Sequence, residues 1–157
     1  MLDLIIKNGS CYINGELKNQ NIGIKDCKIV EIGKIETDSI NILDATNLTV
    51  LPGCIDTQVH FREPGSTDAE DLNSGSRAAI VGGITSVFEM PNTNPPTSTK
   101  NEFLKKLNLA KNRMYCNYAF YFGATAKNEN ELADLKDLEG CCGIKLFAGS
   151  STGNLLV

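Results

Sequence analysis

The side chains best suited to chemistry in this sequence are polar residues placed at short apolar runs. Gln58, His60 and Arg62 are spaced two apart at the end of one run. Asn92 follows a second run, and Lys145 interrupts a later one. Imidazole is a common metal ligand, and the planar guanidinium fork of arginine matches a carboxylate. These residue types predict a polar site assembled from several separate segments.

Three of these residues also have an ordinary structural explanation. His60 is the only histidine, and a lone histidine in a strand is more often structural than a ligand. Gln58 and His60 are two residues apart, so in a strand they would share one face. Arg62 could instead form a salt bridge at the rim with Glu63 or Asp68. An unpaired ammonium is costly to bury, so Lys145 either extends its charge to solvent or is modified for function.

Two kinds of sequence pattern must position these residues. Residues 1–52 contain short β-branched runs, and Asn14-Gly15 is typical of a type I′ hairpin turn. From residue 53, strand-like runs alternate with helical patterns, which predicts a parallel sheet. The four strands are expected at 55–61, 85–90, 115–123 and 141–147. Either a doubly wound sheet or a barrel would satisfy this order, but no G-x-G-x-x-G motif supports dinucleotide binding.

The helices of this second region have recognisable starts. Capping-box patterns at 67–70 and 99–102 predict that two helices begin there. The second of these helices is expected to bury residues 103, 107, 110 and 114, and a third is expected at 128–139. In parallel α/β folds, functional groups gather at the carboxyl ends of the strands. The polar residues named above therefore should meet at one rim.

Composition excludes several other classes of protein. The 157 residues carry 15 Lys and Arg against 19 Asp and Glu, a formal charge of −4 without a basic block, so nucleic acid is not an expected partner. No apolar run reaches about 18 residues, and the first residues do not resemble a signal peptide. The six cysteines form no C-x-x-C pair and are expected to be reduced, with those at 54, 116 and 142 buried. We expect a soluble cytoplasmic protein with no membrane partner.

The segment 52–65, PGCIDTQVHFREPG, closely resembles the signature of dihydroorotases and related cyclic amidohydrolases. Residues 82–85 and 90–95 match the next two blocks of that family, and 143–147 resembles the strand that supplies a carboxylated lysine. The resemblance implies an α/β fold. Residues 53–157 would form the first four βα units of a TIM-like (β/α)₈ barrel, preceded by the N-terminal part of a small β-sandwich at 1–52.

The resemblance also implies an activity, namely metal-dependent hydrolysis of a cyclic amide. The expected reaction is the interconversion of carbamoyl-aspartate and dihydroorotate in pyrimidine biosynthesis, with one or two zinc ions as cofactor. By position, His60 and Lys145, the latter as a carbamate, would bind metal. Arg62 and Asn92 would hold the carboxylate of a small-molecule substrate. Gln58 stands where the family has a first histidine, and its amide oxygen is a weaker, neutral ligand for zinc.

Gln58 leaves three interpretations open. The enzyme uses a single metal, binds two with altered geometry, or is an inactive dihydroorotase-like subunit that scaffolds a partner such as aspartate transcarbamoylase. Among enzymes, an allantoinase or a hydantoinase is the alternative. Arg62 favours a substrate with a carboxylate, which simple hydantoins need not carry.

The sequence contains only part of what the family's active site requires. A (β/α)₈ barrel takes about 250 residues, and no second histidine is present. We therefore expect an N-terminal fragment, inactive alone, whose general base and remaining metal ligands lie beyond Val157. The open sheet edge of such a fragment would favour association, including formation of a homo-oligomer.

Overall fold

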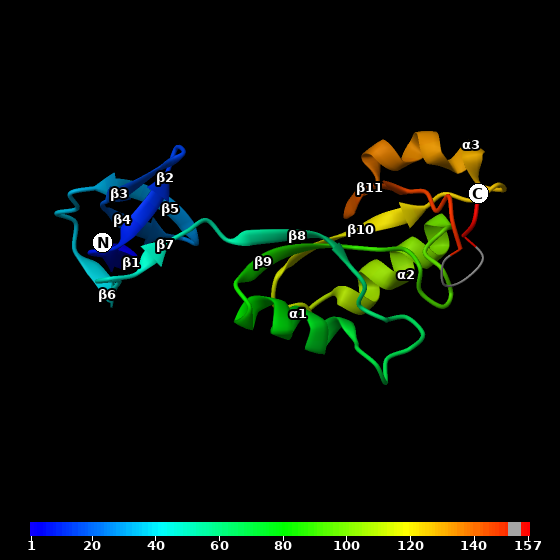
Figure 1. Cartoon of the computed structure of the whole chain (residues 1–157), viewed down its shortest axis with the longest axis horizontal. Coiled ribbons are helices and arrows are strands. Elements are labelled where there is room, and N and C mark those ends of the chain that lie inside the picture. The colour runs from blue at the N-terminus through cyan, green and yellow to red at the C-terminus, as the bar shows by residue number, and fades with distance from the viewer. Residues whose placement is uncertain (151–154) are drawn as a thin grey trace. The chain divides into compact units, whose positions relative to one another are not determined.

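The chain divides into two compact units, Met1–Pro52 and Gly53–Val157. The structure is a computed structural model that describes residues 1–150 and 155–157 (Figure 1). None of the helices in these ranges is long and apolar enough to cross a membrane.

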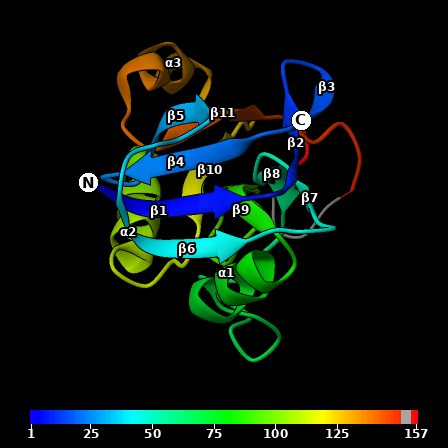
Figure 2. The ribbon, with the colours of Figure 1, turned by 90° about the vertical axis from the view of Figure 1, so that its left-hand side faces the viewer.

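The first unit consists of two small sheets. Its larger sheet has the strand order β5-β4-β1-β6, in which β1 and β6 are parallel and the other pairs antiparallel (Figure 2). The strands are β1 (Leu2–Lys7), β4 (Asn21–Lys25), β5 (Lys28–Gly33) and β6 (Ser39–Asp44). The smaller sheet contains β2 (Ser10–Ile13), β3 (Glu16–Asn19) and β7 (Thr49–Val50). Asn14 and Gly15 between β2 and β3 have φ values of 53° and 87°, as the predicted type I′ turn requires.

The second unit is a parallel sheet with the order β11-β10-β9-β8. Its strands are β8 (Cys54–Val59), β9 (Ile84–Glu89), β10 (Asn117–Gly123) and β11 (Cys141–Lys145). The connections contain α1 (Leu72–Val81), α2 (Lys100–Ala110), and α3 (Glu129–Leu132) continued by the 3₁₀ helix η1 (Ala133–Asp137). Within the described residues the strands are neighbours in chain order without a reversal. That order is typical of a barrel segment and not of a doubly wound sheet.

Several element boundaries differ from the predicted ones. The pattern at 67–70 does not begin a helix, because Asp71 caps α1 and accepts a hydrogen bond from the Ser74 amide at 2.6 Å. Ser74 completes this capping box by accepting from the Asp71 amide, so a serine takes the place of the usual Glu or Gln. The predicted cap of α2 is confirmed, since Thr99 Oγ1 accepts from the Glu102 amide at 3.2 Å. The third predicted helix is only one turn of α-helix before it tightens into η1.

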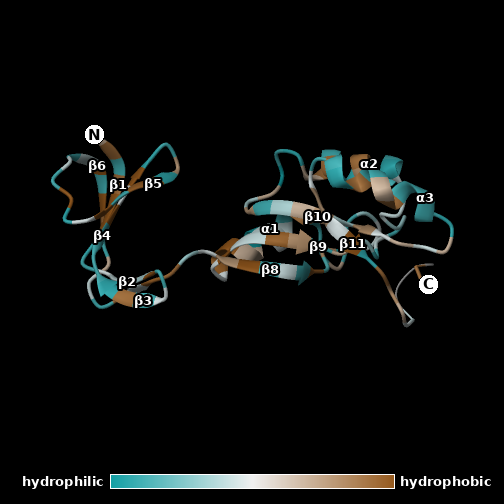
Figure 3. Cartoon of the chain, turned by 90° about the horizontal axis from the view of Figure 1, so that it is seen from above, coloured by the Kyte–Doolittle hydropathy of each residue, from teal (hydrophilic) through white to brown (hydrophobic). Residues whose placement is uncertain are grey.

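The hydrophobic core of the second unit lies between the sheet and its helices. In Figure 3, the ribbon of β9 includes hydrophobic residues, and the ribbon of α2 contains both hydrophilic and hydrophobic residues. The core is formed by the buried side chains of Phe61, Leu72, Val87, Phe103, Ala110, Cys116, Phe120, Phe122 and Leu135. On α2, residues 103 and 110 are buried as predicted, but Met114 lies beyond the helix, which ends at Ala110.

A buried ion pair joins α2 to the end of β9. Lys106 and Glu89 are both fully buried and their charged groups are in contact. The Lys106 ammonium also donates to the Met90 carbonyl at 3.1 Å and lies 5.1 Å from the centre of the Phe120 ring. Among the described residues, neither Glu89 carboxylate oxygen has a further hydrogen-bond partner. Burial raises the pKa of the Glu89 carboxyl, and the positive charge of Lys106 opposes that rise and favours the ionised pair.

A second ion pair fixes the loop that follows β8. Glu63 receives two hydrogen bonds from the Arg113 guanidinium, at 2.7 and 3.0 Å. The same carboxylate accepts from the Leu72 amide at 2.9 Å, at the start of α1. The hydrogen bond from Arg113 to Glu63 raises the pKa of the arginine. The loop 60–71 is therefore attached both to α1 and to the segment after α2.

All six cysteines are free, as the sequence predicted. Cys116 is buried, as expected. Cys54 is exposed, so its expected burial is wrong, and Cys142 is only partly buried. Cys54 lies on β8, an edge strand of the described sheet, so nothing in the described residues covers it from that side.

Lys106→Met should lower the free energy of unfolding by about 3–5 kcal/mol, because it leaves the Glu89 carboxyl buried without its partner. The measurement is urea unfolding followed by circular dichroism. Lys105→Met is the matched control, since the Lys105 side chain is 61% exposed and pairs with Glu102 at the surface, and it should cost less than about 1 kcal/mol. Equal losses in the two variants would contradict the structural role of the pair.

Glu63→Ala should lower the free energy of unfolding by about 1.5–3 kcal/mol, because it removes charge-assisted hydrogen bonds to Arg113 and to the Leu72 amide. Hydrogen exchange of the Leu72 amide should accelerate at the same time. Asp68→Ala, in the exposed part of the same loop, should change stability by no more than about 0.5 kcal/mol. Unaltered exchange at Leu72 in the Glu63 variant would show that the loop is held by other contacts.

Candidate functional site

The predicted site residues lie at or just beyond the carboxyl ends of the parallel strands. His60 and Arg62 follow β8, Asn92 follows β9, and Lys145 is the last residue of β11. In a parallel sheet these ends share one edge. The predicted strand 55–61 is too long, because β8 ends at Val59 and places His60 and Arg62 in the loop.

His60 and Asn92 are in direct contact. The distance from His60 Nδ1 to Asn92 Oδ1 is 2.8 Å. Asn92 is 9% exposed and His60 is half-buried. The backbones are joined nearby, since the Met90 amide donates to the Val59 carbonyl at 3.0 Å. The structure thus brings together one residue predicted to bind metal and one predicted to bind substrate.

Arg62 is exposed in the loop after β8. The alternative of a rim salt bridge with Glu63 is not what the structure contains, because Glu63 binds Arg113 instead. Within the described residues, no carboxylate forms an ion pair with Arg62. Its positive charge nevertheless acts on the buried Glu89, where it opposes the rise in the pKa of that carboxyl.

Gln58 lies in β8 and is exposed. The prediction that Gln58 and His60 share a face assumes regular alternation along the strand, and β8 is irregular between Asp56 and Val59. Asp56 pairs with Val87 and Val59 with Glu89, so β8 contains one residue more than β9 over this stretch. Such a bulge re-aims the side chains of the strand. The Asp56 carboxylate accepts from the Gln58 amide at 2.9 Å inside this bulge.

Lys145 is half-buried at the end of β11. Its ammonium lies 5.1 Å from the centre of the Phe147 ring, a cation–π contact. Its backbone carbonyl accepts from the Ala124 amide at 2.9 Å, which aligns the end of β11 with the end of β10. Within the described residues, Lys145 forms no hydrogen bond or ion pair with His60 or Gln58.

The loops at this edge are packed tightly against each other. The Asn94 amide donates to the Pro64 carbonyl at 2.9 Å. Gly65 has a φ of 121°, and a Cβ atom there would lie 2.9 Å from both Cβ and the carbonyl oxygen of Asn94. Only glycine suits such a conformation and approach. The loops that carry Arg62 and Asn92 are therefore in contact through their backbones.

Sequence reasoning missed the residues that support this edge. Glu89 and Lys106 were not singled out, although a lysine in the apolar stripe of a predicted helix was a usable signal. Asn128 was expected only to begin a helix. Its amide group donates to the carbonyls of Ser98 and Gly123, at 2.8 and 2.9 Å, and its oxygen accepts from the Thr125 amide at 2.8 Å. These bonds tie the loop after β9 to the end of β10.

The donors at this edge fit part of a zinc coordination sphere. His60 offers one imidazole, Gln58 an amide oxygen, and Lys145 a carboxylate-like oxygen if it is carbamylated. The described residues contain no group of three or more His, Cys, Asp or Glu side chains that could hold a metal ion. These donors alone therefore do not make the closed four-ligand set of a structural zinc site.

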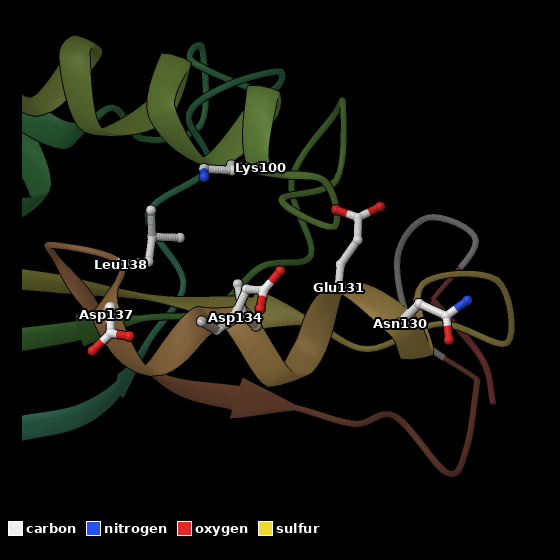
Figure 4. A pocket seen from close by; sticks show the side chains of 7 residues that line it. Lys100, Asn130, Glu131, Asp134, Asp137 and Leu138 are labelled. Carbon is white, nitrogen blue, oxygen red and sulfur yellow. The ribbon is translucent and has the colours of Figure 1, made fainter.

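The residues of this edge do not line the pocket that opens beside α2 and α3. That pocket has a volume of about 270 Å³ and is lined by Lys100, Asn130, Glu131, Asp134, Leu135, Asp137 and Leu138 (Figure 4). It lies on the helical side of the sheet, and none of the predicted site residues contributes to it.

Comparison with known proteins gives relatives for the whole chain. The dihydroorotase of Methanosarcina acetivorans is 39% identical over 157 residues, covering 99% of this chain and 33% of the relative. The allantoinase of Escherichia coli O1:K1 / APEC is 36% identical over 149 residues, covering 94% of this chain and 33% of the relative. The chain thus spans about a third of the length of these proteins.

The fold has equally clear counterparts among solved structures. The L-hydantoinase of Arthrobacter aurescens superimposes with a TM-score of 0.90 at 30% identity, over 100% of this chain and 35% of that one. The D-hydantoinase of a Thermus species gives a TM-score of 0.80 at 28% identity, over 98% and 35%. The predicted α/β fold, part of a TIM-like (β/α)₈ barrel, is thereby confirmed. Residues 49–146 match the Amidohydrolase family, and the chain belongs to that family.

Proposed function

We propose that this chain forms the substrate-facing and metal-facing edge of a dihydroorotase-type cyclic amidohydrolase. The reaction is the interconversion of carbamoyl-aspartate and dihydroorotate. The observation that carries the proposal is the 2.8 Å contact between His60 and Asn92, beside an exposed Arg62 in the adjoining loop. A metal ligand and a carboxylate-binding pair at one edge are what this reaction needs, because the substrate carries both a reacting amide and a carboxylate.

Each residue has a defined role in this proposal. Arg62 donates its guanidinium fork to the substrate carboxylate, and the Asn92 amide donates to the same group. His60 binds zinc through one ring nitrogen, and Lys145 contributes oxygen as a carbamate. The zinc, when bound, supplies Lewis acidity and lowers the pKa of water to about 7. The general base and the remaining ligands come from residues outside 1–157.

Two features favour dihydroorotate over the substrates of related enzymes. The dihydroorotase relatives are 39% identical to this chain, and the allantoinase relatives are 36% identical. Arg62 has no carboxylate partner within the described residues, so its charge is available for an anionic substrate. A hydantoin ring need not carry such a charge. Allantoin remains the nearest competing substrate.

Gln58 supports a second candidate function, a non-catalytic subunit that scaffolds aspartate transcarbamoylase. A neutral amide oxygen binds zinc more weakly than imidazole does. Gln58 also lies in the irregular stretch of β8 between Asp56 and Val59. Zinc binding separates the two candidates, because a scaffold has no requirement for the metal.

Zinc titration of the 157-residue chain against a chromophoric chelator should reveal binding that His60→Ala weakens. Asn8→Ala, at an exposed residue of the first unit, is the control and should bind as the parent chain does. An unchanged zinc affinity in the His60 variant would remove this residue from the ligand set. The chain alone with zinc should not hydrolyse dihydroorotate at an enzymatic rate, because the general base is not within residues 1–157.

Arg62→Met should raise the KM for dihydroorotate about 10–100-fold, because a charge-assisted hydrogen bond contributes roughly 1.5–3 kcal/mol. The measurement uses a chimera in which this chain replaces the matching third of the Methanosarcina acetivorans dihydroorotase. Arg77→Met, at an exposed arginine of α1, should leave KM unchanged. An unchanged KM in the Arg62 variant would remove the carboxylate role, and turnover of allantoin in place of dihydroorotate would reassign the substrate.

A further inference from the structure

The contact between His60 and Asn92 determines which nitrogen of the imidazole carries hydrogen. Asn92 Oδ1 is a carbonyl-type oxygen and can only accept a hydrogen bond. His60 Nδ1, at 2.8 Å from it, must therefore be the donor. In the neutral ring the hydrogen is then on Nδ1 and the lone pair on Nε2.

We infer that Asn92 is a positioning residue that holds His60 as the Nδ1–H tautomer and so directs the Nε2 lone pair away from the protein contact, toward a metal ion. The metal in this statement rests on the proposed function, but the tautomer does not. A metal-binding histidine commonly donates its other ring N–H to a protein oxygen, which fixes both the tautomer and the ring orientation. Asn92 would supply that oxygen here.

The acceptor is held rigidly enough for this role. The Pro91 carbonyl, directly before Asn92, accepts from the amides of Thr93 and Thr97, each at 2.9 Å. The Met90 carbonyl accepts from the fully buried Lys106 ammonium. Asn92 is therefore flanked on both sides by residues whose backbone groups are bound, and its own side chain is nearly buried.

The donor is held against the same segment. The Val59 carbonyl, directly before His60, accepts from the Met90 amide at 3.0 Å. Phe61, directly after His60, is buried in the core against α1, where its ring leaves room only for glycine at position 75. The imidazole is thus fixed between two anchored neighbours, so the hydrogen bond to Asn92 can select one ring orientation.

Asn92 would then have two roles in the proposed reaction. The side-chain oxygen would orient the metal ligand, and the side-chain nitrogen would donate to the substrate carboxylate. An aspartate at position 92 would keep the acceptor for His60 and replace the donor by a negative charge. Asn92→Asp and Asn92→Ala therefore separate the two functions.

The single histidine makes the tautomer directly measurable. In a chain labelled with ¹⁵N-histidine, the ring nitrogens give one pair of signals in a long-range ¹H–¹⁵N correlation spectrum. At about pH 9, where imidazole groups are neutral, the wild-type chain should show mainly the Nδ1–H form, the tautomer that free histidine disfavours. A spectrum dominated by the Nε2–H form would overturn the inference, because it would mean that the Asn92 amide nitrogen faces the ring.

The variants test whether Asn92 is the cause. Asn92→Ala should shift the ring to mainly Nε2–H, whereas Asn92→Asp should retain Nδ1–H. Asn94→Ala, at an exposed position of the same loop, should retain the wild-type signals and serves as the control. An unchanged tautomer in Asn92→Ala would also overturn the inference. The wild-type measurement stands even if one variant fails to fold.

Zinc affinity separates this inference from the proposed function. Asn92→Ala should weaken zinc binding about 10–100-fold, the usual effect of losing an oxygen that orients a metal-bound histidine, and Asn92→Asp should not. Tight binding that is equal in all three chains would overturn the positioning role. A wild-type chain with the Nδ1–H tautomer but without zinc binding would count against the proposed function and support the tautomer assignment alone.

Discussion

A carboxylate and an ammonium sealed away from water fix the position where β9 ends. Glu89 and Lys106 are both fully buried, so each is tolerable in the core only because of the other. The same ammonium binds the Met90 carbonyl, which ties the helix α2 to the first residue after the strand. Asn92 follows two residues later, and its contact with His60 depends on that segment staying in place. The geometry of the candidate site therefore rests on a buried electrostatic interaction between β9 and α2.

The parallel order of the second unit could be predicted from sequence because its signals are local and repeated. Runs of β-branched and aromatic residues alternate with helical stripes, and Thr99 begins α2 as its capping pattern indicates. The first helix was placed too early because Thr67 and Glu70 have the same residue types as a cap, while Asp71 with Ser74 satisfies the free amides better. The third helix tightens into 3₁₀ geometry before Gly140, whose φ is 80°. Such choices depend on tertiary packing, which no local pattern records.

The positions of the candidate residues along the strands were predictable from the sequence, and their contacts were not. The strand-end positions of His60, Arg62, Asn92 and Lys145 follow from the alternation of elements. The partners of these residues do not, because they are set by contacts between segments far apart in sequence. Glu63, next to Arg62, binds Arg113 fifty residues away. The bulge in β8 is similarly invisible in the sequence, since it appears only when β8 is paired residue by residue with β9.

The close approach of Gly65 to Asn94 has a consequence for the diversification of this scaffold. Two loops that touch through their backbones cannot change length or residue size independently, because any side chain at position 65 would collide with the neighbouring loop. Grafting a specificity loop from a relative should therefore transfer segments 61–71 and 90–99 as a single cassette. A larger residue at position 65 would therefore require a compensating rearrangement around Asn94, so the two loops constrain each other's shape.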